Sequence, residues 1–416
     1  MKRVVVTGLG AVTPLGNTVN EFWDNIVAGK SGVSLITKFD TSKFKTNFAA
    51  EVKDFDATAY VDKKELKKYD LYTQYAIAAS DQAIKDAGLD FTTMPEVERY
   101  EVGVIWASGN GGISTFEQQL KDYHLGDGTP RFSPYFIPKM IVDIAAGVIS
   151  IRHKLHGPNY ATVSACASSN TAIINAFDTI RLGKATIMVA GGSEAAITES
   201  SVGGFNSAHA LSKRNEDPQT ASRPFDVDRD GFVIGEGAGA LILEELEHAI
   251  ARGAHIYAEM AGGGMAADAY HLTGTPPDGL GASLGIFKAL ADAGIAPDKI
   301  DYINAHATST GLGDVGELNG IKKIFGDLPV AISATKSMTG HLLGGAGAIE
   351  SVISVLSIVN DTIPGTINTQ TLDPEIPKGL NIILGKSIQQ PVNYVLNNTF
   401  GFGGHTATSI FKKYQA

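Results

Sequence analysis

Short apolar runs alternate with longer segments of helical periodicity along this chain. The apolar runs predict strands at residues 3–6, 101–106, 160–164, 187–190, 256–260, 300–304, 330–333 and 394–396. Apolar residues at helical spacing predict helices at residues 71–87, 167–182, 281–293 and 347–358. Strands that alternate with helices in this way are typical of an α/β protein.

The two halves of the chain show the same order of elements. The matching pairs are a strand followed by glycine at 6–10 and 260–264, small residues after a strand at 107–109 and 305–307, a strand, turn and helix at 161–182 and 331–358, and a glycine-rich turn at 191–192 and 401–404. We therefore predict a duplicated α/β unit with halves 1–250 and 251–416. Segment 212–239 is polar and then glycine-rich, which predicts an ordered surface loop leading into a strand.

Composition narrows the class of protein. The 416 residues are 44% hydrophobic, which is enough for a large core in one big domain or two lobes. The first residues lack the apolar core of a signal peptide, and no apolar run approaches the ~20 residues of a membrane helix. We expect a soluble, cytoplasmic protein without membrane insertion. The net charge of −10 argues against non-specific nucleic-acid binding.

Cys166 is the only cysteine, so it can act only as a thiol. It follows an apolar run and precedes a helical pattern, which places it at a strand–helix turn. The positive end of a helix dipole lowers a thiol pKa, so this position favours a nucleophile. The alternative is a small buried hydrophobic residue, because lone cysteines are buried more often than they are reactive.

Two further segments carry side chains suited to catalysis. His306 follows a predicted strand in a loop of small hydroxyl residues, where it either faces a pocket or is satisfied by its neighbours. Lys336 and His341 lie on a turn that enters a helix carrying Glu350. This helix is apolar on most faces and therefore expected to be buried, so Lys336 and Glu350 are predicted to pair.

A glycine-rich turn near the C-terminus is the last candidate. Residues 401–404 contain three glycines, with Phe400 just before them and Phe402 among them, and the backbone N–H groups of this turn can face a ligand. The spacing is not that of a phosphate loop. Cys166, His306, His341 and Glu350 lack the short paired spacing of zinc ligands, so we expect no metal site.

Four ordered motifs together carry a resemblance to a known family: 165–169, 306–310, 336–341 and 400–404. With them the chain closely resembles β-ketoacyl-[acyl-carrier-protein] synthases, and most of all the synthase II type. The resemblance extends over the whole chain, including 222–226 and 231–233. It implies a thiolase-like fold, with two similar α/β halves forming a layered α-β-α-β-α core. It also implies an acyltransferase that needs no cofactor and performs a decarboxylative Claisen condensation in fatty-acid elongation.

The resemblance also implies roles for individual residues. Cys166 would carry the acyl chain as a thioester, and His306 and His341 would assist decarboxylation of a malonyl thioester. Lys336, paired with Glu350, would set the electrostatics, and the N–H groups of Cys166 and Phe402 would hold the oxyanion. Phe402 would also act as a gate. The substrate-binding residues would be Thr308, Thr310 and Thr273 for the pantetheine arm, and Asn110, Phe136, Ile137, Phe205 and Phe400 for the acyl chain.

The expected partner is an acidic acyl carrier protein, although this chain is itself acidic. A local basic patch would resolve the conflict; its candidates are Lys63, Lys64, Lys67, Lys68, Arg131, Lys213 and Arg214. The alternative for residues 62–70 is an ordinary solvated charged face. The family resemblance implies a homodimer or, with a chain-length partner, a heterodimer.

Some positions depart from related proteins. A second catalytic cysteine, as in thiolases, is absent, and the third catalytic position is a histidine, unlike the asparagine of the chalcone synthase branch. Asn110 stands where the synthase family usually has an apolar residue, Ala307 replaces a glycine, and His209 replaces a common arginine. His405 and Thr406 also depart from the usual pair. These departures leave three hypotheses: a synthase of primary fatty-acid synthesis, a specialised synthase of a polyene, aryl-lipid or polyketide pathway, or a carrier-binding module without turnover.

Overall fold

The computed structural model describes residues 1–415. Its strands are β1 (Val4–Val12), β2 (Ser34–Leu35), β3 (Phe48–Ala49), β4 (Val102–Ala107), β5 (Asn159–Thr162), β6 (Ile187–Glu194), β7 (Gly237–Glu245), β8 (Ala258–Ala267), β9 (Tyr302–Asn304), β10 (Ala331–Ser333), β11 (Thr362–Ile363), β12 (Asn381–Ile382), β13 (Ile388–Gln389), β14 (Tyr394–Gly401) and β15 (His405–Lys412). Its α-helices are α1 (Val19–Val27), α2 (Leu71–Asp86), α3 (Glu96–Arg99), α4 (Ile113–Leu125), α5 (Phe136–Met140), α6 (Ile144–His153), α7 (Ser168–Arg181), α8 (Glu199–Ser207), α9 (Leu246–Ala251), α10 (Leu280–Ala293), α11 (Gly311–Phe325), α12 (Lys336–Thr339) and α13 (Ala346–Asn360). Short 3-10 turns are η1 (Ala57–Ala59), η2 (Leu66–Lys68), η3 (Pro218–Thr220), η4 (Pro297–Lys299) and η5 (Leu343–Gly345).

The main sheet repeats one strand order on either side of its centre. Across the 11 strands the order is β12-β10-β9-β14-β15-β8-β1-β7-β6-β4-β5. In the first half, β1, β7 and β6 pair antiparallel and β6, β4 and β5 pair parallel. In the second half, β8, β15 and β14 pair antiparallel and β14, β9 and β10 pair parallel. The predicted duplication is therefore present, and β1 joins β8 antiparallel at the middle.

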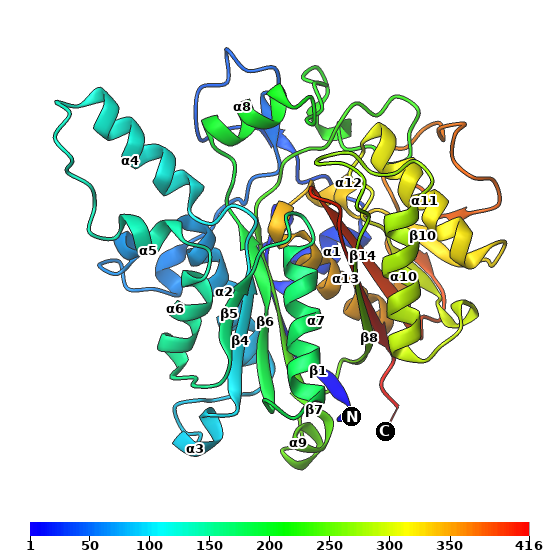
Figure 1. Ribbon diagram of the computed structural model, residues 1–416, viewed down its shortest axis with the longest axis horizontal. Helices are drawn as coiled ribbons and strands as arrows, with labels where there is room; N and C mark the ends of the chain where they lie inside the picture. The colour runs from blue at the N-terminus through cyan, green and yellow to red at the C-terminus, as the bar shows by residue number, and fades with distance from the viewer. Residues whose placement is uncertain (416) are drawn as a thin grey trace.

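Helices form three layers around the two halves of the sheet. Helices α2 and α6 cover the first half, and α10 and α11 lie on the second (Figure 1). Between them, α7 and α13 contact each other and strands of both halves. This is the α-β-α-β-α arrangement of a thiolase-like fold, as expected.

Glycines in β1 let α2 approach the sheet closely. A Cβ atom at Gly8 would lie 2.2 Å from the carbonyl oxygen of Ala83, and one at Gly10 would lie 1.9 Å from that of Ala79. Both distances are well inside van der Waals contact, so only glycine fits at these two positions. The close approach of α2 thus explains the two glycines of this strand.

One helical segment has the length and composition of a membrane span. Leu343–Asn360 has a mean hydropathy of 1.5 over 18 residues, so the expectation that no apolar run approaches this length was wrong. However, 89% of this segment is buried within the protein, where α13 packs against β7 and β14. It is therefore a core helix, as in a soluble protein, and the predicted burial of 347–358 is confirmed.

The predicted loop 212–239 is ordered, but most of it is not on the surface. Ser222, Arg223, Phe225 and Asp226 are buried, and the segment leads into β7. The expectation of a surface loop was wrong because this polar segment finds buried hydrogen-bond partners in the second half of the chain. The strand β15 was also missed, since its inward-facing residues include Thr408 and Ser409.

Candidate active site

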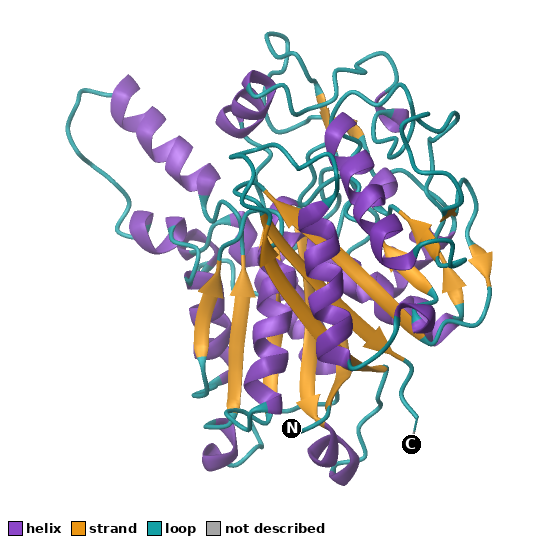
Figure 2. Cartoon of the chain, turned by 45° about the vertical axis from the view of Figure 1, so that its right-hand side comes forward, coloured by secondary structure: helices purple, strands orange, loops and turns teal. Residues whose placement is uncertain are grey.

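The reactive candidates all follow the carboxyl ends of parallel strands. Cys166 follows β5, His306 follows β9, Lys336 follows β10 and Phe402 follows β14. Loops crowd one end of the strands, whereas both chain termini lie at the other end (Figure 2). Parallel sheets commonly place their functional loops at the carboxyl ends of their strands.

Cys166 lies in a sharp turn between β5 and α7. Ala165, just before it, has a φ of 50°, which residues with a Cβ rarely adopt. The Ser168 hydroxyl fixes this turn, because it donates to the Ala165 carbonyl over 2.6 Å and accepts from the Ser164 N–H over 2.9 Å. The turn presents Cys166 directly before the N-terminus of α7, as predicted.

The electrostatic prediction for Cys166 was wrong in sign. Its side chain is partly exposed but surrounded by protein, and this burial raises the pKa of the thiol to about 12. The positive charge of Lys336 opposes the shift, while Glu194 adds to it. Desolvation of a thiolate outweighs the nearby cation, so the resting residue is a thiol.

The two histidine rings lie together. Their centroids are 5.3 Å apart with an edge-to-face arrangement. Burial lowers the pKa of both His306 and His341 well below the usual range, and the charge of Lys336 lowers it further. Both rings are therefore neutral at neutral pH. Neither Nδ1 atom has a hydrogen-bond partner within the described chain.

Backbone contacts fix the two histidines. The N–H groups of His306 and Ala307 donate to the Glu317 carboxylate over 2.9 and 2.7 Å. Burial raises the pKa of Glu317 to about 7, although these N–H bonds oppose the rise. His341 pairs with Val233 and Gly235 through its own N–H and carbonyl, at 2.7 and 2.9 Å.

Lys336 and Glu350 form the expected ion pair. Lys336 Nζ donates to Glu350 Oε1, and both side chains are 1% exposed. Burial raises the pKa of Glu350 to about 7, with Lys336 acting against this rise. Two buried charges require such mutual compensation.

The glycine-rich loop 401–404 lies against the cysteine turn. A Cβ atom at Gly401 would lie only 3.0 Å from the Cys166 nitrogen and 2.6 Å from the Ser164 carbonyl oxygen. The backbone N–H groups of Cys166 and Phe402 donate no hydrogen bond to any part of residues 1–415. Since no other group of the described chain takes up these two donors, they are available to water or to a ligand oxygen.

The predicted pantetheine residues border this site. The hydroxyls of Thr308 and Thr310 are 3.1 Å apart, in the loop that carries His306. Thr273 is exposed, in a loop whose Leu272 carbonyl accepts from the Gly403 N–H over 2.7 Å. Thr273 therefore lies in a loop bonded to the glycine-rich loop, and no hydrogen bond within residues 1–415 joins it to the other two threonines.

The predicted acyl-chain residues divide into two groups. Phe400 packs its ring 5.5 Å from His306, and Phe205 contacts Phe232, which in turn contacts His341. By contrast, Phe136 stacks with Phe116 and Phe132 on the projecting α4–α5 arm, and Ile137 there is 55% exposed (Figure 1).

Asn110 is also exposed, and its backbone N–H donates to Glu194. The buried, unpaired amide considered for Asn110 is therefore not present in the single chain. Phe402 is 39% exposed beside the site.

The basic candidates do not all gather in one place. Lys63, Lys64 and Lys67 are exposed around η2, and Lys68 pairs with Glu65 at 2.5 Å. A groove of about 290 Å³ begins just after η2 at Tyr69 and extends to Ser133 and Lys139, but none of these four lysines lines it. Arg131, close in sequence to Ser133, is 3.6 Å from Asp127. Lys213 and Arg214 belong to another loop, hydrogen-bonded to the segment around Lys45.

Sequence reasoning missed three buried residues around the site. Glu317 anchors the His306 loop, and Phe232 packs against His341. Glu194 accepts from the N–H groups of Gly109, Asn110 and Gly344, so it ties two loops together. In the sequence, Glu194 could be noticed only as a charged residue at the end of an apolar strand, and Glu317 only as a charged residue within a helix. Phe232 gives no comparable signal.

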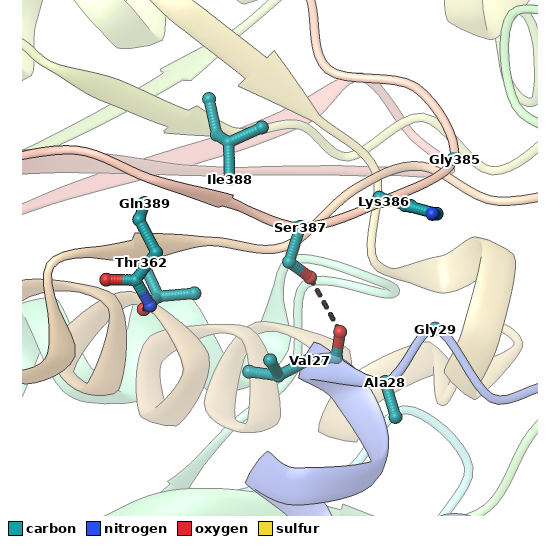
Figure 3. Close-up of a pocket in the computed structure, with 9 residues that line it drawn as sticks. All are labelled: Val27, Ala28, Gly29, Thr362, Gly385, Lys386, Ser387, Ile388 and Gln389. Atoms are coloured by element: carbon teal, nitrogen blue, oxygen red, sulfur yellow. Dashed lines mark hydrogen bonds between the residues drawn. The ribbon is translucent and has the colours of Figure 1, made fainter.

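A second groove lies away from the reactive residues. It has a volume of about 470 Å³ and lies between the end of α1 and β13 (Figure 3). There the Ser387 hydroxyl donates to the Val27 carbonyl over 2.9 Å. None of the predicted site residues lines it.

Comparisons with known proteins agree with this geometry. Residues 1–249 match the model of the "Beta-ketoacyl synthase, N-terminal domain", and residues 257–370 match the "Beta-ketoacyl synthase, C-terminal domain". The chain is 50% identical to a 3-oxoacyl-[acyl-carrier-protein] synthase 2 of Synechocystis sp., with 100% of this chain and 99% of the relative covered.

Two solved structures have the same fold over their whole length. The ishigamide ketosynthase/chain length factor superposes with a TM-score of 0.93 at 34% identity, with 100% of each chain covered. A type II PKS ketosynthase in complex with its acyl-carrier protein superposes with a TM-score of 0.89 at 36% identity, again over 100% of each chain. Since the two domain models match most of the chain and a half-identical relative covers all of it, the chain belongs to the β-ketoacyl synthase family of acyltransferases.

Proposed function

We propose that the protein elongates acyl chains by decarboxylative condensation with a malonyl thioester on acyl carrier protein. Cys166 first takes the acyl group from its carrier, with release of the carrier thiol. Malonyl thioester then loses CO2, and its C2 carbon attacks the acyl carbonyl. A carbon–carbon bond forms, the Cys166 sulfur leaves and regains a proton, and a β-ketoacyl thioester remains. The reaction balances without a cofactor.

The histidines suit the decarboxylation step because they are neutral. As negative charge develops on the thioester oxygen, a neutral imidazole can stabilise it by donating a hydrogen bond from its N–H group. The proximity of the rings of His306 and His341 lets both reach one oxygen. Burial lowers the pKa of both rings most, and the Lys336–Glu350 pair lowers it further by keeping a cation nearby, so both rings stay neutral.

The raised pKa of Cys166 implies that its proton must leave during acyl transfer. A thiolate is the reactive form, and the α7 N-terminus and the Lys336 charge favour it once substrate excludes water. The free N–H groups of Cys166 and Phe402 would then hold the oxyanion of each tetrahedral intermediate.

The proposed carrier-bound substrate agrees with the surroundings of the site. Thr308 and Thr310 offer adjacent hydroxyls to a pantetheine arm, with Thr273 next to the glycine-rich loop. One similar structure holds a ketosynthase with its acyl-carrier protein. We propose that Lys63, Lys64 and Lys67 contact the carrier, with Arg131, Lys213 and Arg214 as further candidates.

We also propose that the protein is a cytoplasmic homodimer and that each chain consists of two halves, which meet near residue 250. The five strands β1 and β4–β7 lie before this position, and the equivalent strands follow it. β5 is a terminal strand of the main sheet, and exposed sheet edges are sites of chain pairing. A heterodimer with a chain-length partner is the alternative.

The observation that carries the proposal is the approach of the Gly401 loop to the Cys166 N–H, beside two neutral histidines. The test incubates wild type, C166A, H306A and H341A with a panel of acyl-carrier substrates and malonyl-carrier, read by mass spectrometry. C166A should form neither acyl-enzyme nor product. H306A and H341A should still acylate Cys166 but lose at least about 100-fold of the decarboxylation rate, within the range for general acid–base groups. Turnover by C166A, or unchanged decarboxylation in both histidine variants, would disprove these assignments. A carrier-binding module would bind without forming product.

A specialised pathway is the second candidate. Asn110, although exposed in the single chain, is polar where the family usually has an apolar residue, and the ishigamide ketosynthase/chain length factor shares the fold. An unpaired amide against an acyl chain costs roughly 1–3 kcal/mol. The same acyl panel separates the two candidates. Long saturated products from wild type support primary elongation, whereas a preference for short or unsaturated groups that N110I reverses supports the specialised role.

A further inference from the structure

A segment of the first half of the chain contacts both loops that carry the histidines. We call residues 225–235 the clamp segment. Its Val233 and Gly235 pair with the backbone of His341, while its Gly231 N–H donates to the Ser309 carbonyl over 3.1 Å. The clamp segment therefore spans the gap between the two histidine loops of the second half.

Arg229 is the basic residue of this segment. Its Nε donates to the Thr310 carbonyl over 2.9 Å, and one terminal nitrogen donates to the Gly311 carbonyl over 2.6 Å. The other terminal nitrogen donates to the Asp226 carbonyl over 2.6 Å and to Asp373 over 2.7 Å. A guanidinium can hold several acceptors in a fixed fork, which an ammonium cannot.

The same loop is held by the carboxylate next to Arg229. Asp314 Oδ1 accepts from the N–H groups of Ser309 and Thr310 at 3.1 and 3.2 Å, and its Oδ2 is 3.5 Å from Arg229 Nε. Ser309 needs such support, because its φ of 70° is a conformation that side chains rarely adopt. Arg229 thus binds carbonyls of this strained loop, and Asp314 binds its N–H groups.

Burial makes this grip strong. The Arg229 side chain is 2% exposed, Asp314 is fully buried and Asp373 is 15% exposed. A buried cation is retained only where charges and hydrogen bonds compensate its desolvation, and here the Thr310 and Gly311 carbonyls and Asp314 supply much of this compensation at the active-site loop. An apolar side chain would fill the same space without holding the loop.

We propose that Arg229 is a positioning residue that sets the geometry of the His306–Thr310 loop. Through the clamp segment, this geometry is coupled to His341. The proposal rests on the proposed function, in which His306 serves decarboxylation and Thr308 and Thr310 hold the carrier arm. Arg229 itself touches neither substrate nor reacting atoms.

The test compares R229K with R181K. Arg181 is a matched control because it also joins the two halves, from α7 to Asp292 of α10 over 2.8 Å, and is 17% exposed. Three quantities are measured well below the melting temperature: the rate of Cys166 alkylation by iodoacetamide, kcat and KM for condensation with malonyl-carrier, and hydrogen exchange of the peptide covering 306–314.

R229K should lower condensation kcat/KM at least about tenfold, keep alkylation within twofold and speed exchange in 306–314. R181K should leave all three quantities near wild type, and any faster exchange should be confined to α7. In the double variant R229K/T310V, the loss should be less than the sum of the single losses, because residues acting through one loop are not additive. Should R229K fail to fold, D373N loosens the same guanidinium from a partly exposed position and should give the same pattern in milder form.

Unchanged exchange and unchanged condensation in R229K, or in D373N if R229K does not fold, would overturn the proposal. Equal losses of alkylation and condensation would also overturn it, because they would indicate a general structural role. Failure of the proposed function is distinguishable, since wild type would then make no condensation product while the exchange measurement would still report on the loop.

Discussion

Cys166 experiences opposing electrostatic effects. The α7 N-terminus and Lys336 favour its thiolate, whereas burial and Glu194 favour the thiol. Burial wins in the free enzyme, with a pKa of about 12. The same burial keeps His306 and His341 neutral. The same low-polarity site therefore keeps both the nucleophile and the hydrogen-bond donors uncharged in the free enzyme. Charge develops there only during the reaction.

The pH dependence of alkylation tests this balance. Iodoacetamide reacts with the thiolate, and a pKa of about 12 lies above the accessible range. The thiolate fraction, and with it the alkylation rate, should thus rise about tenfold per pH unit from pH 6.5 to 9.5 without a plateau. K336M should react more slowly at every pH because it loses the cation that lowers the Cys166 pKa. The control K322M, at a partly exposed lysine of α11 that pairs with Asp327, should match wild type. A plateau between pH 7 and 9 would show that the helix dipole prevails over burial.

At the scale of elements, loops after parallel strands supply the chemistry, and short surface elements surround them. η2 is one such element, with Lys63, Lys64 and Lys67 free of the ion pair that Lys68 makes with Glu65. Because these lysines are exposed, they contribute little to folding and can be altered without loss of stability. Their long-range field can still steer an acidic carrier.

Charge reversal of η2 tests the docking proposal. K64E/K67E should raise KM for carrier-bound substrates several-fold, with a larger effect at low salt, since rim charges act mainly on encounter. Small thioester mimics should be affected less than twofold. The control K184E/K299E changes the net charge equally at exposed lysines elsewhere. Equal effects of the two double variants on carrier-bound substrate would instead support a simple solvated face.

At the scale of the whole molecule, the active site exists only where the two halves meet. The nucleophile comes from the first half and the histidines and Lys336 from the second, with α7 and α13 packed between them. Gly347 allows this contact, since a Cβ there would lie 2.8 Å from that of Asn170. The sheet continues from half to half and ends at β5.

The open edge at β5 leads to a prediction about assembly. Val163, just after β5, is 59% exposed, and Tyr160 on the strand is 40% exposed. V163E should weaken homodimerisation at least about tenfold in sedimentation velocity, because it places a charge on an apolar pairing edge. V97E on α3 is the control, as Val97 is an equally exposed valine (67%). A V163E protein that dimerises like wild type would place the interface elsewhere.

Much of this protein is determined by local sequence patterns. Apolar periodicity gave the strands β1, β4 and β6, and the repeated order of elements predicted two equivalent halves. The apolar surroundings of Glu350 predicted its pairing with Lys336, because a buried charge on such a helix has few possible partners. A strand–helix turn likewise placed Cys166 before α7. Such predictions succeed because hydrogen-bond periodicity and burial leave a direct trace in neighbouring residues.

Only the tertiary structure decided the electrostatics and the long-range anchors. The sign of the Cys166 pKa shift depends on desolvation by many segments, which a local helix-dipole argument cannot sum. The carbonyls held by Arg229 lie 81 and 82 residues away in sequence, and its carboxylate partner Asp373 lies 144 residues away. β15 escaped notice because polar residues such as Thr408 and Ser409 are buried on it, and Thr408 finds its partner only in the folded sheet, where its hydroxyl donates to Asn398. Polar groups in a core reveal their partners only after folding, since nothing in the adjacent sequence specifies which distant group will satisfy them.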